Sequence, residues 1–227
     1  MDRRTMIQSL AAGSAGLVVA GKLQAALPSP AESALPDFPL RSFPFDSGLP
    51  GLSKELLAEH LALYKGYVTR TNALLREVAT ADKEGRNPAS VQELRRRLGF
   101  EFSGLRLHEL YFGSLSIKGS RPTPGHPLQK AIAATWGDSE VWWAAFKATC
   151  TMPGIGWGAL VKDPLTGRLL NAWFQDHENA IPVGTTPILV VDVWEHAYLK
   201  DYGALGRGKY VDALRPLIDW SSVEARF

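Results

Sequence analysis

The chain has 227 residues and a formal net charge of +2 at neutral pH, and 45% of its residues are hydrophobic. This small positive charge gives no indication of a nucleic-acid-binding protein. The single cysteine, Cys150, excludes an intrachain disulfide. Beyond roughly the first thirty residues, the chain is long enough for one compact unit or two small lobes.

The N-terminus has the pattern of an export signal. Arg3 and Arg4 lie in a short cationic head, and an apolar run rich in small residues follows over 9–21. This run is too short for a comfortable transmembrane span. The paired arginines resemble the twin-arginine signal that exports folded bacterial proteins; a plain amphipathic helix is the alternative. We predict that residues 1–34 are an export signal and linker, and that the processed protein is periplasmic or otherwise exported, without stable membrane association.

The next part of the chain predicts one long helix. Residues 35–50 are rich in proline and phenylalanine and are expected to run extended over the surface. Apolar residues then recur at helical spacing over 53–83, where Ser53 can act as the N-cap. Gly66 lies inside this pattern and weakens a helix by about 1 kcal/mol relative to alanine, which indicates a place of close packing.

A second helical region follows the break at Asn87-Pro88. The capping-box pattern Ser90-x-x-Glu93 predicts a short helix over 91–98, which Gly99 is expected to end. A further helical pattern covers residues 100–115. Together with the long helix, these segments predict an antiparallel helical lobe.

The periodicity changes after two shorter helical patterns at 128–135 and 139–151. Residues 157–162 and 168–174, separated by a Pro-Leu-Thr-Gly turn, predict a β-hairpin. The apolar and β-branched run 187–193 predicts a buried third strand.

Helical patterns at 196–202 and 209–218 complete the chain. Helices first, and then a small sheet with helices around it, predict an α+β fold. We expect an N-terminal lobe with a long-helix hairpin over residues 35–118. A C-terminal lobe with a three-stranded antiparallel sheet and surrounding helices is expected over 119–227.

The end of the predicted third strand carries a candidate metal site. Asp192 ends the apolar run, and His196 follows four residues later. A buried carboxylate is unfavourable by several kcal/mol unless it is paired or binds a cation. His196 can reach the same cation as the chain turns into a helix. The spacing alone leaves open that Asp192 caps the next helix while His196 packs nearby.

The residues from Asp192 to Tyr198 read Asp-Val-Trp-Glu-His-Ala-Tyr, and residues 154–157 read Gly-Ile-Gly-Trp. Both motifs closely resemble those of the iron/manganese superoxide dismutase family, whose signature is Asp-x-Trp-Glu-His-Ala-Tyr. The regions 55–68 and 106–112 resemble the two helical ligand regions of the family, and the resemblance covers residues 36–222.

The resemblance implies one iron or manganese ion per chain, bound by three histidines and one aspartate. By position, these ligands are His60, His108, Asp192 and His196, a donor set that suits Fe or Mn. His60 lies seven residues before Tyr67, where the family usually has eight; the absence of a helical bulge would account for the difference. The alternatives are that His60 is a surface residue and that His108 is an ordinary core histidine.

The resemblance also implies residues around the ligands. Tyr67 matches a tyrosine at the mouth of the substrate channel that can relay protons; a packed aromatic is the alternative. His177 matches a position that carries glutamine in many manganese enzymes; an exposed loop residue is the alternative. The aromatic residues expected to wall the metal are Phe112, Trp157 and Trp194.

An interface between two copies is implied as well. Glu195 matches a glutamate that crosses a homodimer interface to the partner's ligand histidine, with a solvated charge as the alternative. Leu199 replaces a tyrosine that meets a histidine across this interface, and Tyr64 or Leu63 replaces that histidine. Gly104 replaces a glutamine of the second helix.

The function that the resemblance implies is superoxide dismutation. Superoxide would be converted to oxygen and hydrogen peroxide by alternating reduction and oxidation of the metal. A non-enzymatic metal-binding relative is one alternative, because the residues around the ligands depart from the family. A metal-dependent hydrolase is another, although the sequence offers no convincing additional general base.

Overall fold

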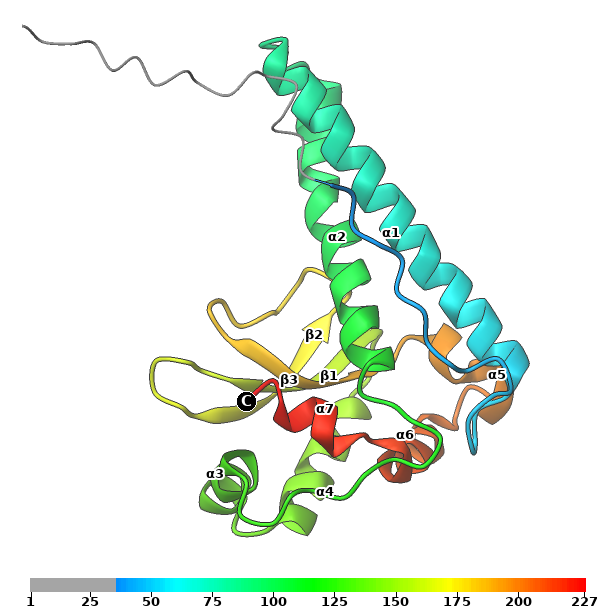
Figure 1. The fold of residues 1–227 in the computed structure, drawn as a ribbon, viewed down its shortest axis with the longest axis vertical. Helices are drawn as coiled ribbons and strands as arrows, with labels where there is room; N and C mark the ends of the chain where they lie inside the picture. Colours follow the sequence, from blue (N-terminus) through cyan, green and yellow to red (C-terminus); the bar gives the residue numbers. More distant parts are fainter. Residues whose placement is uncertain (1–35) are drawn as a thin grey trace, which may run out of the picture. The chain divides into compact units, whose positions relative to one another are not determined.

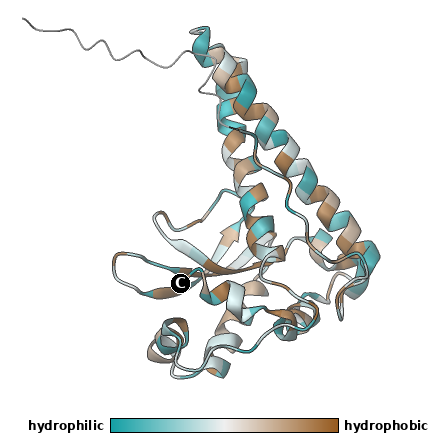
Figure 2. Ribbon diagram, viewed as in Figure 1, coloured by the Kyte–Doolittle hydropathy of each residue, from teal (hydrophilic) through white to brown (hydrophobic). Residues whose placement is uncertain are grey.

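Two long helices form an antiparallel hairpin in the computed structural model, which describes residues 36–227 (Figure 1). α1 spans Lys54–Lys83 and α2 spans Ala89–Phe112. The side chain of Ser53 accepts a hydrogen bond from the Leu56 N–H group, so the predicted N-cap is confirmed. Hydrophobic and hydrophilic residues alternate along both helices (Figure 2), as expected where one face of a helix is buried.

The predicted division of the second helical region at Gly99 is wrong. α2 continues through Gly99. It begins at Ala89, after Pro88, which makes no side-chain capping bond, so the predicted capping box of Ser90 and Glu93 is wrong too. A Cβ atom at position 99 would lie 3.2 Å from Oε2 of Glu178. The glycine therefore leaves room for the loop that carries Glu178, and it does not end a helix.

The segment before α1 runs beside the helix hairpin, as Figure 1 shows in dark blue. The backbone N–H and carbonyl of Phe38 both bond to the side-chain amide of Asn72, at 2.9 Å each. The backbone N–H of Arg41 donates to the hydroxyl of Tyr64. Phe45 is buried, so this extended segment contributes to the core as well as covering the helices.

The sheet has three antiparallel strands in the order β2-β1-β3. β1 spans Gly156–Lys162, β2 spans Leu169–Gln175 and β3 spans Thr186–Asp192. The predicted hairpin and buried third strand are thus confirmed, with bounds that differ by one residue. In the β1–β3 register Trp157 lies opposite Asp192, which places an aromatic side chain beside the carboxylate at the end of β3.

Shorter helices surround the sheet, and the α+β prediction is confirmed. They are α3 (Pro127–Trp136), α4 (Ser139–Cys150), α5 (Leu199–Tyr202), α6 (Arg207–Leu214) and α7 (Trp220–Glu224), with 3₁₀ turns at Glu195–Ala197 and Arg215–Leu217. The continuous helix predicted over 196–202 is a 3₁₀ turn followed by α5, and α7 was not predicted.

Residues 37–227 form one compact unit. The lobe boundary predicted after residue 118 lies between α2 and α3 and stays a prediction. The export signal and linker predicted for residues 1–34 lie outside the described residues. Among residues 36–227, no helix is both long and apolar enough to cross a membrane.

Candidate metal centre

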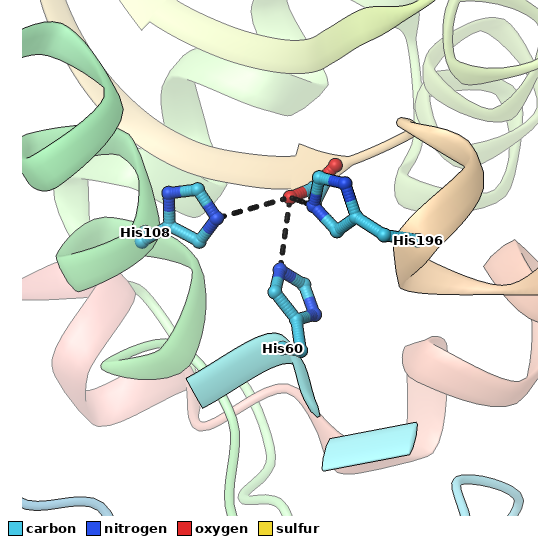
Figure 3. A group of neighbouring side chains, drawn as sticks. His60, His108 and His196 are labelled. Atoms are coloured by element: carbon cyan, nitrogen blue, oxygen red, sulfur yellow. Dashed lines mark hydrogen bonds and ion pairs between the residues drawn. The ribbon is translucent and has the colours of Figure 1, made fainter. Parts of the chain in front are cut away.

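Four side chains with ligand atoms meet where the helix hairpin joins the sheet. His60 comes from α1, His108 from α2, Asp192 from the end of β3, and His196 from the 3₁₀ turn that follows. Their ligand atoms all lie within 4.8 Å of one another. Figure 3 shows the three labelled imidazole rings pointing toward a common point. We call these residues the four-residue group.

One carboxylate oxygen is the centre of the group. Oδ2 of Asp192 lies 3.0 Å from Nε2 of His60, 3.2 Å from Nε2 of His196 and 3.7 Å from Nε2 of His108. The side chains are fully buried except that of His196, which is 26% exposed. The group therefore combines three imidazole nitrogens with one carboxylate, and His196 is its one member with solvent exposure.

The hydrogen bonding of His108 shows that this site suits a metal ion. Nδ1 of His108 donates to the backbone carbonyl of Gly104 at 2.6 Å, so Nε2 of the neutral ring carries the lone pair. Nε2 is buried and has no hydrogen-bond partner among the described residues. A buried lone pair directed at a carboxylate oxygen is unfavourable without a cation, and the donor set is one that Fe and Mn accept.

Burial and mutual contact set the charges in the group. Burial lowers the pKa of His60 despite its bond to Asp192, and burial lowers the pKa of His108 further. Burial opposes ionisation of Asp192, but the charge of His196 and bonds from His196 and His60 hold the pKa of this carboxyl well below its usual range. Conversely, Asp192 raises the pKa of His196 against the effect of burial.

His60 reaches the group from a regular helix. α1 is α-helical throughout 54–83, without a bulge between His60 and Tyr67. A spacing of seven residues returns to the same face of an α-helix, so both side chains face α2. His60 is fully buried, and the alternative of a surface residue is wrong.

Aromatic rings enclose the imidazoles. The ring of Phe112 lies 4.8 Å from that of His60, and the ring of Trp157 lies 5.0 Å from that of His108. Trp194 stacks on His196 at 6.0 Å. All three aromatic residues expected around the metal therefore lie against a histidine of the group.

Tyr67 and His177 form a hydrogen-bonded pair beside the group. The indole Nε1–H of Trp157 donates to Nδ1 of His177 at 3.0 Å, so the neutral ring carries its proton on Nε2. Nε2 of His177 lies 2.7 Å from the hydroxyl of Tyr67 and donates to it. His177 is fully buried, so the alternative of an exposed loop residue is wrong.

The ionisation of this pair follows from its burial. Burial lowers the pKa of His177 to about 4, against the attraction of Asp192. Burial raises the pKa of Tyr67 to about 12, although the nearby Arg70 charge opposes the shift. At neutral pH both groups are therefore uncharged, and Tyr67, which accepts a bond from His177, keeps its own proton to donate.

Gly104 and Tyr210 also position the group, and these two roles were not predicted. A Cβ atom on Gly104 would lie 2.6 Å from Cδ1 of Tyr67, so this glycine admits the tyrosine ring as well as accepting from His108. The hydroxyl of Tyr210 donates to the backbone carbonyl of Asp192 at 2.9 Å. Gly104 lies four residues before the candidate ligand His108 in a helix. This spacing places both residues on one face of the helix and could have indicated their contact.

The residues implied at a subunit interface differ in exposure. Glu195 and Leu199 are exposed, and so is Leu63. Tyr64, by contrast, is buried and donates to Oε1 of Glu109 at 3.1 Å. Of the two residues considered as replacements for the interface histidine, only Leu63 is therefore at the surface.

Comparisons with known proteins agree with this arrangement. A family model described as iron/manganese superoxide dismutases, C-terminal domain, matches residues 124–226. The chain is 36% identical over 182 residues to "Superoxide dismutase [Fe]" of Cupriavidus metallidurans, covering 79% of this chain and 90% of that protein. It is 33% identical over 195 residues to "Superoxide dismutase [Mn/Fe]" of Propionibacterium freudenreichii subsp. shermanii, covering 84% and 96%. It is also 33% identical over 186 residues to "Superoxide dismutase [Mn] 2" of Haloferax volcanii, covering 82% and 92%.

Proposed function

The chain belongs to the iron/manganese superoxide dismutase family, and we propose that the four-residue group is where it converts superoxide to oxygen and hydrogen peroxide. The convergence of three imidazole Nε2 atoms on Oδ2 of Asp192 carries this proposal. The chain is an oxidoreductase that uses iron or manganese, as its relatives' names state.

His60, His108, Asp192 and His196 would hold the metal. When bound, the metal supplies one-electron redox chemistry between its trivalent and divalent forms. Asp192 offsets part of the positive charge, and the carbonyl of Gly104 fixes the ring orientation of His108. The rings of Phe112 and Trp157 restrict water around the buried ligands.

Tyr67 and His177 are the groups suited to supply protons. Formation of hydrogen peroxide from superoxide consumes two protons in each full cycle. His177 donates to the Tyr67 hydroxyl, which leaves the phenol O–H of Tyr67 free to donate elsewhere. Trp157 enforces this direction because it occupies Nδ1 of His177. The ring of Tyr67 stacks on that of His108 with 5.1 Å between the ring centres, so this proton donor lies directly beside the group.

Two further parts of the proposal concern assembly and location. A homodimer with Glu195 at the interface is supported by the exposed position of Glu195 beside His196, and by the exposed apolar side chains of Leu63 and Leu199. Export is supported by Arg3 and Arg4 ahead of an apolar run.

The activity is tested on protein reconstituted separately with iron and with manganese. Superoxide consumption should rise in proportion to bound metal for at least one of the two ions. Metal-free protein should be inactive. A protein that carries a full equivalent of either metal and does not accelerate superoxide loss would contradict the proposed function.

A further inference from the structure

A buried carboxylate holds two arginines next to Tyr67. Glu101 on α2 is only 1% exposed. Its Oε2 accepts from Nε of Arg70 on α1 at 2.7 Å. Its Oε1 accepts from Nε and an Nη of Arg97 at 2.9 and 2.8 Å. One carboxylate balances one of the two guanidinium charges, so the cluster keeps a net positive charge.

Each guanidinium lies on an aromatic ring that contacts His177. Arg70 is 4.8 Å from the centre of the Tyr67 ring, and Arg97 is 4.1 Å from the centre of the Phe100 ring. These rings lie 4.9 and 4.6 Å from the ring of His177. The arginine side chains remain about half exposed, at 50% and 49%. The two guanidinium groups therefore present positive charge to solvent close to the proton-donating pair of Tyr67 and His177.

Gly66 on α1 leaves the space that the guanidinium of Arg70 occupies. A Cβ atom on Gly66 would lie 2.8 Å from an Nη atom of Arg70. Any other residue at position 66 would push the guanidinium away from its position. Glycine weakens the middle of α1 by about 1 kcal/mol relative to alanine. In return, Gly66 allows Arg70 to lie over the ring of Tyr67.

We propose that Arg70 and Arg97 form a docking site for small monovalent anions beside Tyr67, with Glu101 as the residue that positions them. The inference rests on the proposed function, in which the anion is superoxide. Glu101 engages one N–H of Arg70 and two of Arg97, whereas each guanidinium has five donors. The remaining donors and the net charge can attract an anion and release it toward the four-residue group.

The loop after β2 brings opposite charge to the same neighbourhood. Asp176 precedes His177 and accepts from the backbone N–H of His177. Glu178 is exposed and lies near Gly99 on α2. These carboxylates repel anions. The local anion affinity therefore depends on the balance between the two arginines on the helices and the two acidic residues on the loop. Removing an arginine and removing Glu178 should therefore have opposite effects.

The test uses azide as a probe that binds without turnover, titrated optically into the iron-loaded protein. Arg70→Gln and Arg97→Gln should each weaken azide binding by roughly fivefold at low ionic strength, as expected for the loss of one nearby charge. Glu178→Gln should strengthen it, and Arg70→Lys should keep most of the wild-type affinity. Arg86→Gln, which removes the same charge from the exposed Arg86–Glu84 pair beyond α1, is the matched control and should change little.

The dependence on salt concentration distinguishes electrostatic attraction of the anion from a structural effect of the substitutions. kcat/KM for superoxide should follow the order of azide affinities, and the differences should disappear between about 0.01 M and about 1 M salt, where the Debye length falls from about 30 Å to about 3 Å. Equal azide affinity and equal salt dependence in wild type and both glutamine variants, with metal content unchanged, would overturn the docking site. An equal effect of Arg86→Gln would overturn it too.

The azide arm also separates this inference from the proposed function. If the wild type does not dismutate superoxide but the arginine variants bind azide more weakly, the docking site stands and the function fails. If the wild type dismutates superoxide and the variants match it in both measurements, the docking site alone fails.

Discussion

The imidazole Nε2 of His177 lies 2.7 Å from the hydroxyl of Tyr67, although 110 positions separate the two residues in the chain. α1 supplies the tyrosine, and the loop that follows β2 supplies the histidine. Trp157 on β1 fixes the histidine tautomer through its indole N–H. Three separate elements therefore determine the direction of one hydrogen bond next to the four-residue group.

Replacing His177 by alanine should lower kcat about tenfold, because Tyr67 loses its donor and Trp157 loses its acceptor. His177→Gln should lose less, since an amide can accept from Trp157 and donate to Tyr67. Both variants should keep the bound metal of the wild type. Steady-state kinetics with elemental analysis measures both quantities, and an unchanged kcat in His177→Ala would refute the proton-donating role.

The stability of the metal-free protein should depend on His177 at acid pH. The native pKa of His177 is about 4, below its ordinary value of 6.5. Between these values the unfolded chain binds a proton that the native state does not, so the free energy of unfolding falls as pH falls through this window. The contribution present above pH 6.5 is ~3 kcal/mol, and it is lost by pH 4.

His177→Gln removes this contribution, so its free energy of unfolding should decrease less than that of the wild type between pH 6.5 and 4. Urea unfolding at several pH values measures the difference. His60 and His108 add the same kind of dependence in both proteins, and the comparison cancels it. Parallel curves for the two proteins would show that His177 is not held neutral by burial.

Gly104→Ala should destabilise the metal-free protein by about 1–3 kcal/mol, because the new Cβ atom would overlap the ring of Tyr67. Displacement of this ring should also lower activity. Gly66→Ala is a useful contrast, since its Cβ atom would meet only the flexible end of Arg70 and alanine favours the helix. Equal stability of Gly104→Ala and wild type would contradict the tight packing of Tyr67 against α2.

Changing Arg3 and Arg4 together to lysine should retain the folded protein in the cytoplasm of a bacterial host with a twin-arginine pathway. Fractionation with activity staining would locate the protein. Undiminished export of the double variant would contradict this route and leave an ordinary secretory signal as the explanation.

The helices and strands were predictable where local chemistry decides them. Ser53 caps α1 as expected, and the apolar run that ends at Asp192 forms β3. The predicted helix end at Gly99 is wrong because glycine favours helix ends only where no distant contact decides otherwise. Its role is instead set by Glu178, a residue distant in sequence.

The candidate site was likewise predictable only where nearby residues or the family resemblance indicated it. Asp192 and His196 lie four residues apart and could be paired from the sequence, and the resemblance to a family supplied His60 and His108. The Arg70–Glu101 contact could not be predicted. Charged residues on a helix normally indicate a solvated face, and only the packing of α1 on α2 reveals that Glu101 is buried.

The metal content of His60→Ala tests the central claim most directly. His60 is the proposed ligand whose spacing departs from the family, and its Nε2 atom lies 3.0 Å from Oδ2 of Asp192. Elemental analysis of reconstituted protein should give about one equivalent of iron or manganese for the wild type and for His126→Ala, whose histidine caps α3 outside the group. His60→Ala should retain far less metal under the same conditions. A full equivalent of metal in His60→Ala would contradict the four-residue site.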